Sequence, residues 1–281
     1  MELASKKRKR MGKTTFICSS LLVLAALFYL SPFYWMISTA FKVQEDIISS
    51  PVHLVPPRLT LFHMLNVFTE YGGLKSLLDS LIIASIVTAI CIIVGSFAAY
   101  SLARFRTGGK NLAFWILSNR MLPPMAFVLP FFILFKNWGL IDTHRGLILA
   151  YLTFDLPFAT WILRSFFYKI PAELDESAMI DGASYITILF RIIIPLAGPG
   201  IAATAVLCFV FSWNEFLFAF LLTRGGVRTI PVLIPMLYGG HDILYGEVSA
   251  ISMVATIPMI VLVIFFHRYL VTGLSLGAVK E

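Results

Sequence analysis

Charged residues are scarce in this chain of 281 residues, because Asp, Glu, Lys and Arg together make up only 13%. Soluble proteins typically contain about 25% of these residues. Apolar residues make up 59% of the chain, and so few polar side chains could not cover the surface of a soluble domain of this length. The composition therefore excludes an ordinary soluble enzyme and predicts an integral membrane protein built from α-helices.

The sequence also lacks the motifs of several kinds of site. Its three cysteines, Cys18, Cys91 and Cys208, form no C-x-x-C pair and lie in apolar stretches, so no redox centre or zinc site is indicated. The five histidines are scattered without ligand spacing, and no G-x-x-x-x-G-K-[ST] phosphate loop occurs. We therefore expect no catalytic residue, no metal and no cofactor on this chain. If a nucleotide powers it, another chain binds that nucleotide.

Long apolar stretches are abundant, and a membrane helix needs about 20 mainly apolar residues. The third stretch is interrupted by the pairs Asn119-Arg120 and Pro123-Pro124, where we expect the helix to break, either as a hinge or as a passive kink. We predict an all-α integral membrane protein with one transmembrane domain over residues 16–270. It follows a basic segment, 1–15, and precedes a tail, 271–281. The six predicted spans are residues 16–37, 80–103, 112–135, 146–166, 200–222 and 248–266.

The basic residues predict the orientation in the membrane. Lys and Arg number 22 against 15 Asp and Glu. If the N-terminus lies inside, fourteen of the 22 basic residues fall in cytoplasmic segments and seven in outer loops. An excess of Lys and Arg on the cytoplasmic side is typical of membrane proteins. We therefore expect a multi-pass protein of a cell membrane with both termini in the cytoplasm. The basic run at 6–10 could also suit nucleic acid, but it directly precedes a span, so we expect no nucleic-acid partner.

The loop between the fourth and fifth spans, residues 169–199, carries the clearest local pattern. A short helix is predicted by Pro171 and the acidic residues Glu173, Asp175 and Glu176, because negative charge is favourable in the first turn. Gly182 predicts a sharp turn. A second, amphipathic helix should follow and end at Pro195 and Pro199, with its apolar stripe at Tyr185, Ile188, Leu189 and Ile192. The pattern alone would also suit a connector that rests on the membrane surface.

The spacing in this loop resembles a signature of the permease subunits of binding-protein-dependent ABC importers. That signature is E-A-A, three residues, G, nine residues and I-x-L-P. It is matched here by 176–178, Gly182 and 192–195, with Ser177 in place of alanine and Ile194 in place of leucine. Other stretches resemble the maltose-type second permease subunit of carbohydrate importers, among them LSPFYWMISTAFK, PPMAFVLPFFILFKNWGLIDTHRGLIL and FSWNEFLFAFLLT.

The resemblance implies a subunit that moves a sugar, oligosaccharide or polyol into a prokaryotic cell by alternating access. It implies as partners a homologous second permease subunit, two ATPase subunits that carry ATP and Mg, an extracytoplasmic solute-binding protein, and membrane lipid. The outer loop 223–247 would touch the binding protein, although its apolar part, 230–237, could instead fold over the bundle. The tail residues Gly273, Gly277 and Lys280 would approach the ATPase subunits. The loop residues that would couple to an ATPase are Glu176, Ser177, Ala178, Asp181, Gly182, Ala183, Ile192 and Pro195.

Polar residues inside the predicted spans are candidates for a solute pathway. A charge at mid-bilayer costs about 2.5–3.5 kcal/mol, so Arg120, Asp155 and Glu215 should avoid lipid. They could line a water-filled path in which carboxylates and amides bind sugar hydroxyls and an aromatic ring stacks on the sugar. They could equally pair inside the bundle or lie near an interface. The candidate pathway residues are Asn119, Arg120, Asp155, Trp213, Asn214 and Glu215.

Two other classes of protein compete with the importer. A secondary transporter driven by protons or sodium could use Asp155 and Glu215 for ion coupling, but it would have no role for the loop signature. A membrane enzyme would need a catalytic constellation near an interface, and the scattered histidines and acidic residues offer none. ATP dependence of uptake distinguishes the importer from the secondary transporter.

Overall fold

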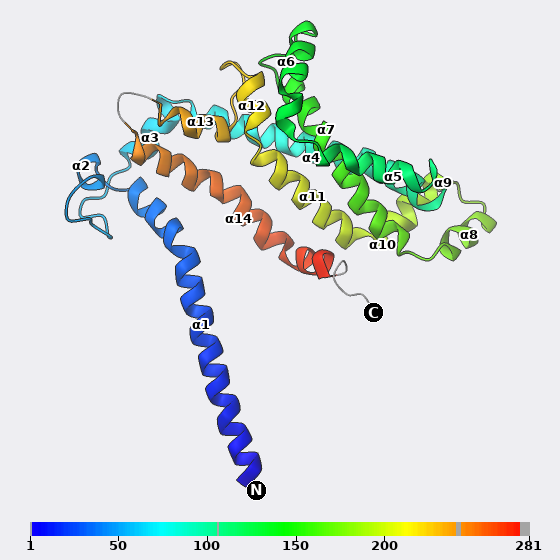
Figure 1. Cartoon of the computed structure of the whole chain (residues 1–281), viewed down its shortest axis with the longest axis horizontal. Helices are drawn as coiled ribbons and strands as arrows, with labels where there is room; N and C mark the ends of the chain where they lie inside the picture. Colours follow the sequence, from blue (N-terminus) through cyan, green and yellow to red (C-terminus); the bar gives the residue numbers. More distant parts are fainter. Residues whose placement is uncertain (1, 106, 240–242, 276–281) are drawn as a thin grey trace. The chain divides into compact units, whose positions relative to one another are not determined.

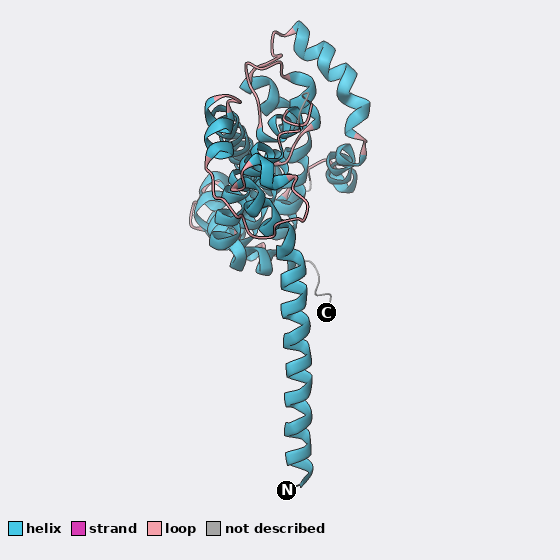
Figure 2. Cartoon of the chain, turned by 90° about the vertical axis from the view of Figure 1, so that its left-hand side faces the viewer, coloured by secondary structure: helices cyan, strands magenta, loops and turns pink. Residues whose placement is uncertain are grey.

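The computed structural model describes residues 2–105, 107–239 and 243–275. These residues form helices joined by loops (Figure 2). Their one piece of β-pairing is an isolated bridge between Lys42 and Leu59. The predicted all-α class is confirmed. The described elements are the α-helices α1 (Glu2–Ala40), α2 (Gln44–Ile47), α3 (Phe62–Thr69), α4 (Gly73–Arg104), α5 (Gly109–Ser118), α6 (Val128–Asn137), α7 (His144–Tyr168), α8 (Glu173–Ile180), α9 (Tyr185–Ile188), α10 (Ile194–Leu196), α11 (Gly198–Trp213), α12 (Leu217–Leu222), α13 (Ile230–Met236) and α14 (Tyr245–Ser275), the 3-10 turns η1 (Asn119–Met121) and η2 (Pro124–Phe127), and the π-helical stretch η3 (Leu189–Ile193).

Four of these helices, α1, α4, α7 and α14, are long and apolar enough to cross a membrane. Two further pairs are long enough only when both members are taken together. Asn111–Met121 and Pro124–Asn137 meet at 88°, and Tyr185–Leu196 and Gly198–Trp213 meet at 82°. Six spans result if each bent pair is one span. The break predicted in the third span is present, because Leu122 and Pro123 are extended between η1 and η2.

The fifth predicted span differs from the structure. It was expected to run unbroken over 200–222, but α11 ends at Trp213 and α12 begins at Leu217. Glu215 explains the new start, because its carboxylate accepts hydrogen bonds from the backbone N–H groups of Phe218 and Ala219 at 2.9 and 3.2 Å. These donors have no partner within the first turn of a helix, so the glutamate caps α12 in the middle of the apolar stretch.

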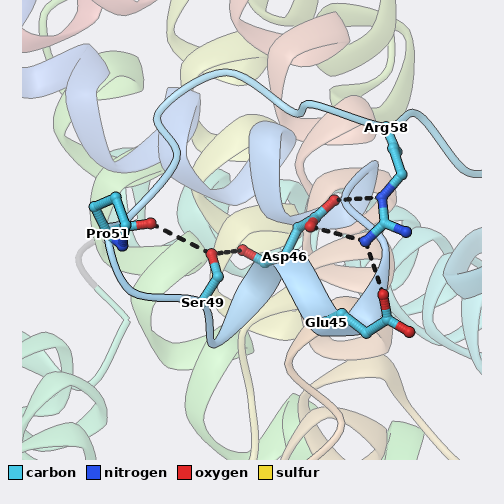
Figure 3. A network of polar contacts seen from close by, with 5 residues as sticks. All are labelled: Glu45, Asp46, Ser49, Pro51 and Arg58. Carbon is cyan, nitrogen blue, oxygen red and sulfur yellow. Dashed lines mark hydrogen bonds and ion pairs between the residues drawn. The ribbon is translucent and has the colours of Figure 1, made fainter.

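The chain groups into two compact units, residues 1–71 with 237–254 and residues 72–236 with 255–281. In the first unit, the segment after α1 is fastened by Arg58 (Figure 3). Arg58 Nη2 lies 2.8 Å from Glu45 Oε2 and 3.0 Å from Asp46 Oδ1, and Ser49 donates a hydrogen bond to the Asp46 carbonyl. The hydrogen bond from Arg58 lowers the pKa of Asp46. These two ion pairs link residues 45 and 46 to residue 58 and so close the loop between them.

The second unit is built around α4, α7 and α11, which pack along one another (Figure 1). Their contact faces are apolar and include Ile83, Leu147 and Ala150, all buried. At Gly200 of α11 a Cβ atom would overlap the ring of Phe166 on α7, so only glycine allows these helices their close approach. In α1, by contrast, nearly every side chain from Thr15 to Ile37 is exposed, which is the surface expected of a helix in contact with lipid or another subunit.

Candidate functional site

The predicted short helix in the loop 169–199 is present as α8. Glu173, Asp175 and Glu176 lie in its first turn, where the helix dipole favours negative charge. Pro171 was expected at the first helical position. It lies two residues earlier, and its carbonyl accepts a hydrogen bond from Leu174 N. The helix type and place were thus predicted, and the start differs by one half-turn.

Gly182 ends α8 in a Schellman motif. Its φ is +86°, and its N–H donates to the Met179 carbonyl at 3.0 Å, while Ala183 N donates to the Ala178 carbonyl at 2.9 Å. Ala178 and Ala183 are both half-buried and pack on the same apolar cluster. The predicted sharp turn therefore has a specific conformation that side chains other than glycine rarely adopt.

A buried ion pair that the sequence patterns did not indicate anchors α8 to α4. Arg104 Nε and Nη2 lie 2.8 and 3.2 Å from the two carboxylate oxygens of Asp175, and Tyr100 donates its hydroxyl proton to the same carboxylate at 3.0 Å. Arg104 also donates to the Ile170 carbonyl at 3.0 Å. Asp175 is 4% exposed. Its partners lie more than 70 residues away in the sequence, so no local spacing pointed to them.

The second loop helix has a different buried face from the one predicted. Ile188 and Leu189 are buried as expected, but Tyr185 is exposed and Ile193, rather than Ile192, completes the buried face. The π-helical stretch η3 is the reason, because its hydrogen bonds span five residues and shift the side chains that follow. Ile192 is half-buried and Pro195 is exposed.

The other predicted coupling residues form the outer face of α8 and its turn. Glu176, Ser177 and Asp181 are exposed, and Ser177 donates its hydroxyl to the Glu173 carbonyl. Ile180 is 87% exposed, the highest value among the large apolar side chains of the described residues. This face thus combines the exposed carboxylates of Glu176 and Asp181 with the apolar side chain of Ile180. The buried Asp175 anchors α8 to α4.

A cavity of about 280 Å³ lies in the second unit, and three of the six predicted pathway residues line it: Arg120, Asp155 and Glu215. The Arg120 guanidinium lies 4.1 Å from the ring centre of Phe158 and 4.3 Å from that of Phe211. Its Nη1 is buried and has no hydrogen-bond partner among the described residues.

The carboxylates of the cavity have separate local partners. Asp155 is 5% exposed and accepts a hydrogen bond from the Ser212 hydroxyl at 2.8 Å, and Glu215 caps α12. Asp155 thus lies buried and Glu215 half-buried within the second unit.

The three remaining pathway candidates do not line the cavity. Trp213 is buried and stacks on Phe209 with ring centres 5.6 Å apart. Asn214 donates its amide to the Val210 carbonyl, and Asn119 is an exposed residue of η1. Tyr151, Phe154 and Phe218 line the cavity instead. The sequence gives no signal that these residues line a cavity, because aromatic and apolar residues are abundant throughout it.

Two carboxylates hold the loop that follows α12. Asp142 accepts hydrogen bonds from the backbone N–H groups of Arg224, Gly226 and Val227 at 2.8–3.0 Å. Burial opposes ionisation of Asp142, but these donors prevail and its pKa is lowered. Asp79 accepts from Arg228 N at 3.0 Å and lies 2.8 Å from His144 Nε2.

The apolar part of the outer loop, for which contact with a binding protein was expected and packing over the bundle was the alternative, forms helix α13. Ile230, Val232 and Leu233 are buried within the second unit, where α13 packs on α4 and α12. These side chains cover the bundle, which was the alternative for this stretch. In the tail, Gly273 belongs to α14, whereas Gly277 and Lys280 lie outside the described residues.

Comparisons with known proteins agree with this geometry. The family model described as binding-protein-dependent transport system inner membrane component matches residues 91–275, more than half of the chain. The chain is 38% identical to a trehalose/maltose transport system permease protein of Thermococcus litoralis, over 92% of this chain and 94% of that protein. It is 36% identical to a trehalose transport system permease protein of Mycobacterium tuberculosis, over 89% and 92% of the two chains.

Among solved structures, the fold is similar to a chain of a bacterial ABC transporter involved in the import of the acidic polysaccharide alginate. The TM-score is 0.73 and the sequence identity 24%, with 91% of this chain and 96% of that chain covered. At this identity the likeness concerns the fold, which is that of an ABC permease.

Proposed function

The chain belongs to the family of binding-protein-dependent transport system inner membrane components, and from this premise we propose how it couples and what it carries. It is a multi-pass membrane permease subunit of an ABC importer of the sugar-transporting group. We propose that its solute is a neutral saccharide or polyol, as the names of the trehalose and maltose relatives suggest. We further propose that both termini lie in the cytoplasm.

The surface formed by α8 and its turn at Gly182 is the proposed site of coupling to an ATPase subunit. The observation that carries this proposal is the anchoring of α8. The Asp175–Arg104 ion pair ties the helix to α4, so a push on α8 moves a membrane helix rather than a loose loop. Glu176 and Asp181 stand free to meet basic groups of a partner, and Ile180 offers an apolar contact. ATP and Mg would bind to two such ATPase subunits and not to this chain.

The remaining partners follow from the same proposal. A homologous second permease would complete the pathway and cover exposed apolar side chains of α1, with lipid covering the rest. A solute-binding protein on the outer side would deliver the solute. A solved structure of similar fold is a bacterial alginate ABC transporter in complex with an alginate pentasaccharide-bound periplasmic protein, which supports such a partner here.

We propose that the cavity lined by Arg120, Asp155 and Glu215 lies on the solute pathway. Nη1 of Arg120 is a buried donor without a hydrogen-bond partner among the described residues, and the aromatic side chains of Phe154 and Phe218 also line the cavity. Donors, acceptors and aromatic rings together suit the hydroxyls and the C–H faces of a sugar. Arg120→Met should reduce uptake, whereas Arg145→Met, which changes an exposed arginine of α7 outside the cavity, controls for loss of positive charge.

Uptake into sealed vesicles that contain the complete assembly tests the proposed function. Radiolabelled trehalose or maltose should enter only with ATP and the external binding protein, and collapse of the proton and sodium gradients should leave uptake unchanged. Glu176→Ala combined with Asp181→Ala should reduce both uptake and retention of the ATPase during purification. Uptake driven by an ion gradient without ATP would replace this proposal by the secondary transporter.

A further inference from the structure

The first unit contains a further cavity, lined by both polar and apolar side chains, that lies apart from the residues considered so far. It has a volume of about 650 Å³ and is lined by residues from α2, α3 and the start of α14, within the range of about 300–1,000 Å³ found for small-molecule sites. Its polar lining residues are Gln44, His63, Asn66, Tyr245 and Glu247. Under the proposed topology, the segment between the first two spans and the start of α14 face the outside of the cell.

A buried carboxylate is held at a defined position in this cavity. Glu247 is 2% exposed. Asn66 donates its amide to Glu247 Oε1 at 2.9 Å, and His63 Nδ1 lies 3.1 Å from Glu247 Oε2. The His63 ring lies so close to Gly246 that a Cβ atom there would overlap it. The tight packing keeps the imidazole beside the carboxylate.

Several polar atoms of this cluster have no hydrogen-bond partner. His63 is 1% exposed, and neither of its ring nitrogens, nor Glu247 Oε2, completes a hydrogen bond with any residue in the described part of the chain. The 3.1 Å approach of His63 to Glu247 is close enough for attraction, but its angle does not make a hydrogen bond. Buried polar atoms are normally paired, so the cluster has both donor and acceptor capacity left for a bound group.

The chemistry of the cluster excludes two classes of ligand. A metal ion needs more ligands than this pair, and no three His, Cys, Asp or Glu residues come together to hold one within the described ranges. An anion would be repelled by Glu247. A hydroxyl group both donates and accepts, so it can satisfy the carboxylate and the imidazole at once. The rings of Phe62 and Tyr245, 60% and 40% exposed, add apolar faces to the same cavity.

We propose that this cavity binds a neutral, hydroxyl-rich solute, a saccharide or polyol, on the outer side of the membrane. This inference rests on the proposed function and adds a second solute site to it, occupied when the solute leaves its binding protein. Glu247 accepts hydrogen bonds from the solute, Asn66 positions that carboxylate, and Phe62 and Tyr245 pack against the solute's C–H faces.

The test measures solute binding without the binding protein. The complete membrane assembly is placed in lipid nanodiscs, and trehalose and maltose are used as probes in saturation-transfer NMR with titration. Glu247→Gln and Asn66→Ala should each weaken binding by about tenfold or more, the effect of losing one hydrogen bond to a charged group. Glu70→Gln is the matched control, because Glu70 follows α3 directly and is exposed outside the cavity. It should leave binding within about twofold, well below that effect.

Each result decides for or against the inference. Equal binding by Glu247→Gln, Asn66→Ala and the unaltered chain would overturn it, as would the absence of binding of both probes while ATP-driven uptake persists. In that second case the proposed function stands and only the cavity is wrong. Binding that the variants abolish, in an assembly without ATP-driven uptake, would retain the cavity and refute the importer. If Glu247→Gln fails to assemble, Phe62→Ala removes one exposed aromatic ring of the lining and is expected to weaken binding in the same assay.

Discussion

Replacement of Asp175 by alanine tests whether α8 is held rigidly to α4. The carboxylate has three contacts within 3.2 Å, two from Arg104 and one from Tyr100. The side chains of Asp175 and Arg104 are only 6% and 10% exposed. Loss of one partner of such a buried pair leaves the other charge uncompensated and costs about 3–5 kcal/mol. Since 1.4 kcal/mol is a factor of ten, the opening of α8 should become about 10² to 4 × 10³ times more favourable.

Hydrogen–deuterium exchange of the peptide over residues 172–183 measures this opening directly. In Asp175→Ala, the hydrogen-bonded amides of Asp181, Gly182 and Ala183 should exchange faster. The increase in rate cannot exceed the factor by which these amides are protected in the unaltered chain. ATP-driven uptake should fall, because a detached α8 no longer moves α4. Glu176→Ala is the matched control, since this neighbouring carboxylate is exposed and its removal should leave exchange unchanged.

A double variant separates the charge pair from general damage to the helix. Asp175→Leu with Arg104→Met replaces the pair by apolar side chains, which often costs less than the removal of one partner. The double variant should therefore exchange more slowly than either Asp175→Leu or Arg104→Met. The anchoring argument is refuted if Asp175→Ala leaves the exchange of residues 172–183 at the level of the unaltered chain.

Three further predictions concern single positions. Gly182→Pro should insert into the membrane but abolish uptake and ATPase co-purification, because proline cannot adopt a φ of +86° and removes the N–H bonded to Met179. Gly182→Ala should lose about 1–2 kcal/mol of turn stability and retain partial uptake. Normal uptake by the proline variant would contradict the coupling role. Asp142 has a lowered pKa, so its stabilisation is present above its unfolded pKa of about 3.9 and is lost as the pH falls through the lower folded value. The thermal midpoints of Asp142→Asn and the unaltered chain should thus differ at pH 6 and converge below about pH 4, and a constant difference would count against the ionised clamp. Gly200→Leu should destabilise the α7–α11 packing by about 1–3 kcal/mol through collision with Phe166, and an unchanged thermal midpoint would disprove the close approach.

Local patterns predicted the elements whose causes are local. The apolar stretches around α4, α7 and α14 were found because each exceeds the thickness of a bilayer core. Helix α8 and its turn were found because acidic residues favour a helix start and Gly182 favours a helix end. The break in the third span followed from its proline pair.

Other features were missed because distant residues cause them. For the apolar stretch 230–237 the sequence left two alternatives open, contact with a binding protein or packing over the bundle, and residues 230–236 pack on α4 and α12 as α13. The stripe of the second loop helix was displaced by η3, a π-helical stretch that a regular helical period does not include. Of six polar pathway candidates, only three line the cavity of the second unit.

The sequence by itself determined the class of the protein, the approximate spans and the turn at Gly182, because composition, apolar length and backbone conformation act over a few residues. Only the tertiary structure decided that Asp175 lies against Arg104, and that Glu247 lies against Asn66 and His63. These partners are separated by 71 to more than 180 residues along the chain. A buried charge must find its partner wherever the packing of helices brings one, and no spacing within a single helix encodes that meeting.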